Sequence, residues 1–170
     1  MFYEDVFRAL NKARVQYLVA GGVGVVLHGF PRFTADLDLI IHLEEKNIDR
    51  FFETVAKLGY RPRLPVTKED FKNKHKRTEW IKTKNITVFS FFRSKKPMET
   101  IDLFVKEPIK FEIMAKDAEI IRVKNIAIPT VSIKHLIQLK KKAGRPEDLI
   151  DIANLKVIQR SKSRISLKRD

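Results

Sequence analysis

The chain has 170 residues, including 35 Lys or Arg, 21 Asp or Glu and no cysteine, and its net charge is +14. This length suits one domain with a single core, and the lack of cysteine excludes disulfide frameworks, zinc fingers and thiol nucleophiles. No apolar run approaches the length of a membrane span and the N-terminal segment is unlike a signal peptide, so a cytoplasmic protein without membrane contact is expected. The excess of positive charge indicates an anionic partner, such as a nucleotide or a nucleic acid.

Hydrophobic periodicity and the positions of Gly and Pro predict five elements in the first third of the chain. In chain order these are a helix over 2–13, a strand over 16–20, a short helix over 23–27, a strand over 36–42 and a helix over 48–58. The first strand ends at Gly21-Gly22, and the last helix ends at Gly59.

The segment 61–84 holds nine Lys or Arg against three acids and is expected to be partly loop. Beyond it the predicted elements are strands over 86–92 and 100–105, a helix over 111–118, a hairpin of 120–123 and 126–128, a helix over 131–142 and a helix from Pro146 to about 158. The basic tail, 159–170, is expected to be frayed or disordered. The sequence therefore indicates one α+β domain over 1–158, in which the helices of 131–158 form a layer or a small subdomain.

Three acidic residues on predicted strands are the candidates for chemistry. Asp36 and Asp38 alternate within one strand, so they point to the same face about 7 Å apart and can bind one ion together. Asp102 lies in another predicted strand and could complete a two-metal site. A hard divalent cation is one way to satisfy such carboxylates, because a buried unpaired charge is costly. Pairing with Arg32 at the strand edge is the alternative without a metal.

The turn after the first strand supplies a second candidate feature. Gly21 and Gly22 lack Cβ atoms, which lets the backbone approach a ligand, and the N–H groups that open the next helix point toward an anion. A phosphate beside Mg²⁺ would fit there. The sequence thus indicates a nucleoside triphosphate with Mg²⁺, held by two glycines and two carboxylates, although paired glycines are also common in plain turns.

The order of these residues resembles the nucleotidyltransferase superfamily typified by DNA polymerase beta, with its hydrophobic strand, Gly-Gly or Gly-Ser, Asp-x-Asp and later single Asp. The matching stretches are 17–22, 27–38 and 101–103. A closer resemblance, through 28–38 and 136–151, is to nucleotidyltransferases related to the AbiEii abortive-infection toxins. The resemblance covers most of the chain, from about residue 15 to 155. One departure is Gly22, where many members have a Ser whose hydroxyl could contact a phosphate.

The resemblance implies a mixed β-sheet that carries the acids on one face, with helices packed on one face and C-terminal helices. It implies transfer of a nucleoside monophosphate from an NTP to an acceptor hydroxyl, with release of pyrophosphate. Asp36, Asp38 and Asp102 would hold two Mg²⁺ ions, with Mn²⁺ as an alternative, and Asp102 would help to deprotonate the acceptor. Lys140 would place a cation on the triphosphate. The remaining candidate nucleotide contacts are Gly21, Gly22, Arg32 and Asp148.

The sequence leaves the acceptor open. The net positive charge favours an RNA such as tRNA. A hydroxyl of a partner protein, as in toxin–antitoxin systems, is the alternative within the same chemistry, and a cationic aminoglycoside is less compatible with a basic protein. A nucleic-acid-binding module without catalytic activity is the alternative from a different class. No local motif encodes the choice of NTP or the oligomeric state.

Overall fold

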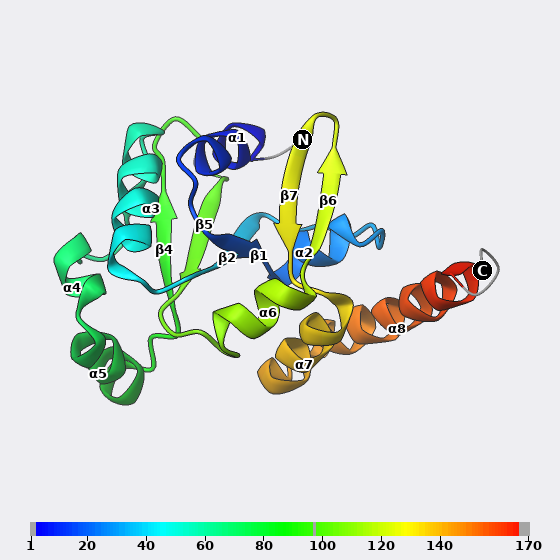
Figure 1. The fold of residues 1–170 in the computed structure, drawn as a ribbon. Coiled ribbons are helices and arrows are strands. Elements are labelled where there is room, and N and C mark those ends of the chain that lie inside the picture. The colour runs from blue at the N-terminus through cyan, green and yellow to red at the C-terminus, as the bar shows by residue number, and fades with distance from the viewer. Residues whose placement is uncertain (1–2, 97, 167–170) are drawn as a thin grey trace.

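The computed structural model describes residues 3–96 and 98–166, which fold as a seven-stranded mixed β-sheet with flanking helices (Figure 1). The strands are β1 (Tyr17–Val19), β2 (Asp36–Ile41), β3 (Arg61–Pro62), β4 (Val88–Phe92), β5 (Thr100–Phe104), β6 (Glu119–Val123) and β7 (Ile126–Thr130). The helices are α1 (Glu4–Lys12), α2 (Gly21–Leu27), α3 (Glu45–Lys57), α4 (Lys68–Lys72), α5 (Lys74–Lys84), α6 (Phe111–Asp117), α7 (Ile133–Ala143) and α8 (Pro146–Ser166). The α+β class with a mixed sheet, predicted from the sequence, is confirmed.

The strand order across the sheet is β3-β4-β5-β2-β1-β7-β6. β2 and β5 are parallel neighbours, as are β1 and β7, and the other neighbouring pairs are antiparallel. In the β2–β5 pair Asp36 lies beside Thr100 and Asp38 lies beside Asp102. The register therefore places the acidic residues of two strands that are distant in sequence next to each other.

One face of the sheet is covered by α1, α3, α4 and α5. Leu37, Leu39 and Ile101 point into this core and have no exposed surface. Two fully buried phenylalanines, Phe51 of α3 and Phe71 of α4, pack there with their rings at angles to those of neighbouring phenylalanines, a geometry that aromatic pairs prefer. This core fixes the strands from which the acidic side chains project on the opposite side.

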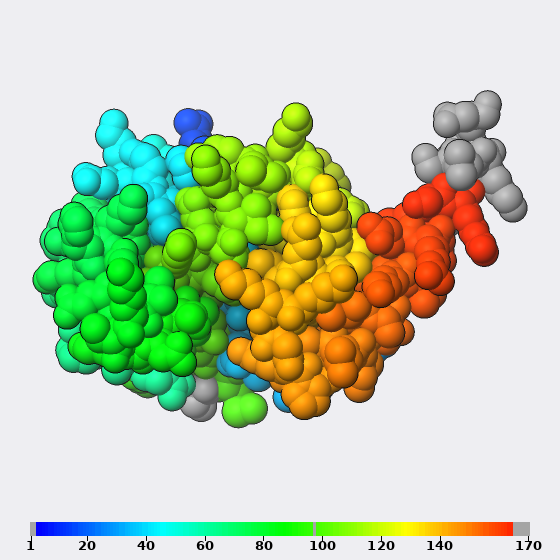
Figure 2. Space-filling view, turned by 90° about the horizontal axis from the view of Figure 1, so that it is seen from below, coloured from blue at the N-terminus to red at the C-terminus, as the bar shows by residue number. Residues whose placement is uncertain are grey.

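The opposite face of the sheet is only partly covered. α2, α6, α7 and α8 pack there around buried apolar residues that include Leu18 and Ile40. On β4 and β5, by contrast, Ser90, Phe92 and Asp102 on this face keep partial exposure. In the space-filling view, part of the blue N-terminal region stays visible between the green surface and the orange surface of α7 (Figure 2). We call this partly exposed area of β2, β5 and β4 the open half of the sheet.

The segment 61–84 is partly loop, as expected, over 63–67 and at Asn73, but α4 and α5 make up most of it. The side chain of Thr67 accepts the Asp70 N–H, and the Asp70 carboxylate accepts the Thr67 N–H, which forms a capping box at the start of α4. The expectation of a frayed or disordered tail from 159 is wrong, because α8 continues through Ser166 instead of ending near 158. It extends away from the body of the molecule (Figures 1 and 2). The rest of the expected tail, 167–170, lies outside the described residues.

The remaining elements follow the sequence expectations, with boundaries that differ by a few residues. Ser132 accepts the His135 N–H at the start of α7, and Gly144, with φ of 67°, ends that helix. Positive φ is tolerated by glycine because it has no Cβ. Within the described ranges, no helix is both long and apolar enough to cross a membrane.

Candidate active site

Three carboxylates meet on the open half of the sheet. Asp36 and Asp38 alternate along β2, and Asp102 on β5 lies in register with Asp38. Residues in register on neighbouring strands point to the same face, and so do residues two apart on one strand. Asp36 is exposed, whereas Asp38 and Asp102 are partly buried. The structure thus brings together the three acids that the sequence singled out.

Burial and mutual repulsion disfavour the ionised form of the carboxylates in this cluster. Burial, followed by the charges of Asp102 and Asp36, raises the pKa of Asp38 from its usual range to about 6. Burial and the charge of Asp102 also raise the pKa of Asp36, while Arg63 acts in the opposite direction. Raised pKa values from burial and like charges are typical of carboxylates that bind a cation or act as general acids and bases.

The donor set fits a hard divalent cation. Oδ1 of Asp102 is buried and has no hydrogen-bond partner among the described residues, and a buried acceptor of this kind is costly unless something satisfies it. Within 3–96 and 98–166, however, no group of three or more His, Asp or Glu side chains is arranged to hold a metal ion alone. Mg²⁺ is commonly held by one or two carboxylates together with substrate phosphates and water. The carboxylates therefore fit an ion that arrives with a nucleotide.

The glycine pair brings the turn between β1 and α2 against the carboxylates. A Cβ at Gly21 would overlap Oδ2 of Asp38, and a Cβ at Gly22 would overlap Oγ1 of Thr34. Gly21 also has a φ of 57°, in the left-handed region that favours glycine. The backbone of Ala20 is tied to the same strand, because its N–H donates to the carbonyl of Asp38 at 2.9 Å. Both glycines are therefore required by close approach to the candidate site.

Substitution of Gly21 by Ala should test this close approach. Gly21→Ala is expected to displace the Asp38 side chain and to destabilise the protein by about 1–3 kcal/mol more than a comparable change elsewhere. The matched control is Gly59→Ala, because Gly59 also has a positive φ, of 84°, but nothing lies within 4 Å of its would-be Cβ. Urea unfolding of both variants measures the difference. Equal destabilisation would contradict the proposed contact with Asp38.

A buried ion-pair network joins α7 and α8, which pack on the same side of the sheet as the carboxylates. Nζ of Lys140 lies 3.0 Å from Oδ1 of Asp148 and 2.7 Å from Oδ2 of Asp151. Arg32 also forms an ion pair with Asp151. Lys140, Asp148 and Asp151 are 7%, 5% and 2% exposed, so their charges compensate one another away from water. The charge of Arg145, followed by that of Lys140, lowers the pKa of Asp38 against the larger effects that raise it.

Lys140, Asp148 and Arg32 lie in this ion-pair network and not in the carboxylate cluster. Nζ of Lys140 donates a hydrogen bond to Asp148 and forms an ion pair with Asp151. Asp148 also accepts the backbone N–H of Arg145 at 3.2 Å, at the start of α8. Asp148 and Arg32 thus have protein partners, and they lie in one network with Lys140.

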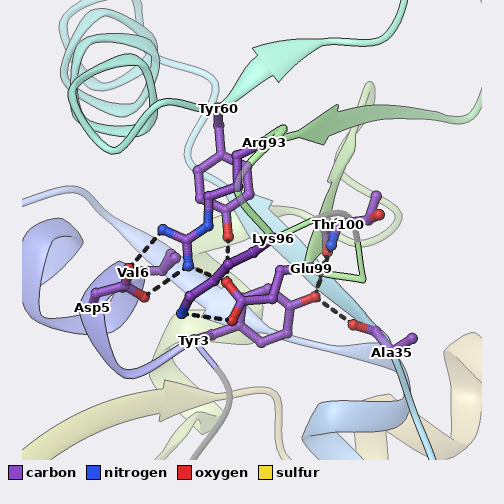
Figure 3. A network of polar contacts seen from close by, with 9 residues as sticks. All are labelled: Tyr3, Asp5, Val6, Ala35, Tyr60, Arg93, Lys96, Glu99 and Thr100. Carbon is purple, nitrogen blue, oxygen red and sulfur yellow. Dashed lines mark hydrogen bonds and ion pairs between the residues drawn. The ribbon is translucent and has the colours of Figure 1, made fainter.

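The N-terminal ends of β2 and β5 are joined by the hydroxyl of Tyr3 (Figure 3). This hydroxyl accepts the Thr100 N–H at 2.9 Å and contacts the carbonyl oxygens of Ala35 and Thr100. Tyr3 is 2% exposed. Ala35 directly precedes Asp36, and Thr100 lies two residues before Asp102, so Tyr3 fixes the backbone that carries both acids.

A second polar cluster supports this junction from the side (Figure 3). Arg93 pairs with Asp5 and with Glu99, and Lys96 pairs with Glu99 at 3.0 Å. The Tyr60 hydroxyl donates to Glu99 at 3.2 Å, and the Arg93 guanidinium lies 4.8 Å from the centre of the Tyr60 ring. These contacts tie α1 and the turn before β5 to the start of the sheet.

Tyr3→Phe is expected to destabilise the protein by about 1–3 kcal/mol, because the buried Thr100 N–H loses its acceptor. The matched control is Tyr17→Phe, which removes a part-buried hydroxyl that donates to the Asn11 side chain at 2.9 Å; its expected cost is about 1 kcal/mol or less. Urea unfolding at neutral pH compares the two. A Tyr3→Phe variant no less stable than Tyr17→Phe would show that the bridge between β2 and β5 contributes little.

Sequence reasoning did not identify Tyr3, Thr34 or Asp151 as supporting residues. A signal existed for Asp151, because it lies three residues after Asp148 on one helix and so shares its face. Tyr3 contacts residues that are distant in sequence, and Thr34 matters because of its closeness to Gly22 in space. Neither relationship produces a local sequence pattern.

Comparison with known proteins agrees with this geometry. Residues 3–155 match the model of the family described as aminoglycoside-2″-adenylyltransferase. No curated protein is significantly similar to the chain in sequence.

Solved structures share the fold at low sequence identity. The lincosamide antibiotic adenylyltransferase LnuA, solved with lincomycin, superposes with a TM-score of 0.60 at 16% identity, over 90% of this chain and 93% of that one. ANT(2″)-Ia, in complex with adenylyl-2″-tobramycin, gives a TM-score of 0.57 at 12% identity, over 95% of each chain. A candidate nucleotidyltransferase from Thermotoga maritima gives a TM-score of 0.57 at 12% identity, over 99% of this chain and 91% of that one. At these identities the likeness supports the fold alone.

Proposed function

Because the chain belongs to the aminoglycoside-2″-adenylyltransferase family and is thus a nucleotidyltransferase, we propose that it transfers a nucleoside monophosphate from an NTP with Mg²⁺ to an acceptor hydroxyl, using Asp36, Asp38 and Asp102. The observation that carries this proposal is the cluster of three carboxylates on the open half of the sheet. The buried, unpartnered Oδ1 of Asp102 and the raised pKa of Asp38 support a cation-binding role.

The proposed roles follow from the position of each residue. Asp36 and Asp38 would hold Mg²⁺, or Mn²⁺, and orient the triphosphate, and Asp102 would complete the site for a second ion. The bound ions would neutralise charge on the phosphates. Gly21 brings the turn close to Asp38, and the backbone N–H groups at Gly21 and Gly22 would contact the phosphate groups. Lys140 would add positive charge near the triphosphate from its buried position, with Asp148 and Arg32 as members of the network that holds it.

The reaction joins the acceptor oxygen to the α-phosphorus and breaks the bond from that phosphorus to the pyrophosphate oxygen. The acceptor hydroxyl loses its proton, for which the Asp102 carboxylate is the proposed base. Pyrophosphate leaves with the electron pair of the broken bond. The protein's contribution is to align the two substrates and to stabilise the charge that develops between them.

For the acceptor, the charge of the chain favours an RNA such as tRNA, because a net charge of +14 attracts polyanions. The family match favours a second candidate, a hydroxyl of a small molecule, since one similar structure is a lincosamide antibiotic adenylyltransferase and another holds adenylyl-2″-tobramycin. Transfer to a partner protein, as implied by the resemblance to AbiEii-related toxins, is the third. The single domain over 1–158 would suffice for each of these reactions.

The decisive experiment incubates the purified protein with each α-labelled NTP, with Mg²⁺, Mn²⁺ or EDTA, and with total tRNA, a cell lysate, or a panel of aminoglycosides and lincosamides. The control is the Asp36→Ala, Asp38→Ala double variant. Metal-dependent label in an acceptor, absent with EDTA and with the control, is the expected result. Transfer that the double variant retains would overturn the proposed metal site. In the wild-type reaction, the distribution of label among RNA, protein and small molecule identifies the acceptor.

A further inference from the structure

The acceptor's position can be inferred from the order of the strands. The glycine turn leads into α2 and lies against β2, through the contact of Gly21 with Asp38. Asp102 lies on β5, on the other side of β2 from β1, and β4 follows next in the sheet. If the triphosphate lies at the glycine turn, the acceptor has to approach Asp102 from the side of β4. The surface of β4 on the open half is therefore the place to look for acceptor contacts.

On β4, one aromatic side chain faces this approach. Phe89 and Phe91 are each 2% exposed and belong to the core on the other face. Ser90 and Phe92 alternate with them and lie in register with Asp102 and Thr100 of β5. Phe92 is partly exposed and lies on the same face as the acids. A partly exposed aromatic ring two strands from Asp36 is available for stacking.

A cation covers the same ring. The guanidinium of Arg63 lies 5.7 Å from the centre of the Phe92 ring, within the range of a cation–π interaction. The backbone of Arg63 is fixed, because its N–H donates to the carbonyl of Ser90 at 2.8 Å. Arg63 is exposed and forms no ion pair with a carboxylate of the described residues. Its positive charge also acts on the carboxylate cluster, because it lowers the pKa of Asp36.

We propose that Phe92 and Arg63 bind the acceptor as a single-stranded polynucleotide, with a base stacked on the Phe92 ring and a phosphate paired with Arg63. This inference rests on the proposed function and specifies its acceptor. An aromatic ring beside an exposed arginine is the combination that binds single strands without sequence preference.

The test measures binding of a short fluorescent single-stranded RNA by anisotropy, without NTP or metal. Phe92→Leu is expected to weaken binding by about fivefold or more, since loss of base stacking has an effect of this order. Arg63→Gln is expected to weaken binding and to reduce the slope of log K against log salt by about 0.7, the value for one phosphate contact on a single strand. Phe92→Leu should leave that slope unchanged.

The matched control is Lys12→Gln, which removes one exposed positive charge from α1, on the covered side of the sheet. It should change RNA binding by less than about twofold, because a single distant charge is screened by salt. Thermal unfolding checks that Phe92→Leu is folded, and Arg63→Gln, a change of an exposed side chain, tests the proposal independently of that outcome.

The outcomes separate this inference from the proposed function. RNA binding that is indifferent to both substitutions, or absent from the wild-type protein, overturns the inference even if nucleotidyl transfer occurs. Transfer of label to a partner protein or to an aminoglycoside, unaffected by Arg63→Gln, also overturns it. RNA binding that depends on both residues supports Phe92 and Arg63 as the RNA-binding surface. If the same preparation transfers no nucleoside monophosphate, that result counts against the proposed function only.

Discussion

Asp38→Asn is expected to lower kcat for nucleotidyl transfer by about a thousandfold and to raise the stability of the protein at neutral pH. The loss of activity follows because removal of a carboxylate that holds a catalytic ion costs several kcal/mol of transition-state stabilisation, and each 1.36 kcal/mol is about tenfold in rate. The gain in stability follows from the crowding of Asp38 by Asp36 and Asp102. A residue that only supports the fold would show the opposite pattern.

The pH dependence of this stability gain has a definite sign. The pKa of Asp38 is about 6 in the folded protein, above its ordinary value of 3.8. Between these values the folded state binds more protons than the unfolded state, so the contribution of Asp38 to stability falls as pH rises. Above about pH 6 the ionised Asp38 lowers the free energy of unfolding by at most about 3 kcal/mol, because each pKa unit corresponds to 1.36 kcal/mol. Asn has nearly the same volume and no charge, so it escapes this cost.

Urea unfolding at pH 4 and pH 7.5 in EDTA measures the effect as the difference between Asp38→Asn and the wild-type protein. The difference should be small at pH 4 and should favour the variant at pH 7.5. The control is Asp49→Asn on α3, where pairing with Lys72 and Lys68 lowers the pKa; this variant should instead lose stability at pH 7.5. Added Mg²⁺ with NTP should stabilise the wild-type protein alone. A variant that keeps its kcat would contradict the metal site.

Lys140→Met is expected to have the largest effect on stability, a loss of about 3–5 kcal/mol, because it leaves buried carboxylates without their cation. Asp148 would lose its lysine partner, and Asp151 would keep only Arg32. Since Lys140 lies on α7 and its two acidic partners lie on α8, the helices should separate most readily in this variant. The charge that it contributes near Asp38 would also disappear.

Denaturant unfolding compares Lys140→Met with Lys141→Met, which changes the exposed neighbour on the same helix and should stay within about 0.5 kcal/mol of the wild-type protein. A triple variant with Asp148→Asn and Asp151→Asn should recover part of the loss, because it removes the stranded charges as well. If Lys140→Met were as stable as Lys141→Met, the network would not be the connection between α7 and α8 described above.

Much of the geometry of the candidate site was predictable because it depends on simple periodicities. The alternation of Asp36 and Asp38 places them on one face of any strand, and the apolar patterns around Leu39 and Leu103 identify buried strands. The sequence proposed Asp102 as the residue that completes a two-metal site with Asp36 and Asp38, but its register with Asp38 was not predictable, since register between distant strands has no local signal. The bridge from Tyr3 to Thr100 was invisible for the same reason.

The segment 61–84 shows why the rest was harder. Its basic composition hides the helices, because α5 buries little more than Arg77 and Trp80 and has no clear apolar stripe. The capping box at Thr67 and Asp70 was the available signal for α4. The continuation of α8 beyond 158 depends on no packing partner that the sequence reveals, so the length of that helix could not be deduced from hydrophobic periodicity.

The parallel pairing of β2 with β5 has a consequence for how the protein reaches its active state. The two strands are joined by a long crossover that includes α3, α4 and α5, and closing such a loop costs entropy before the new contacts form. Folding dominated by distant contacts of this kind is slow compared with helix formation. During synthesis, the carboxylate cluster cannot assemble until β5 has emerged, and the charge of Lys140 arrives only after α7. Recovery of catalytic activity after dilution from denaturant should therefore lag behind recovery of helical signal.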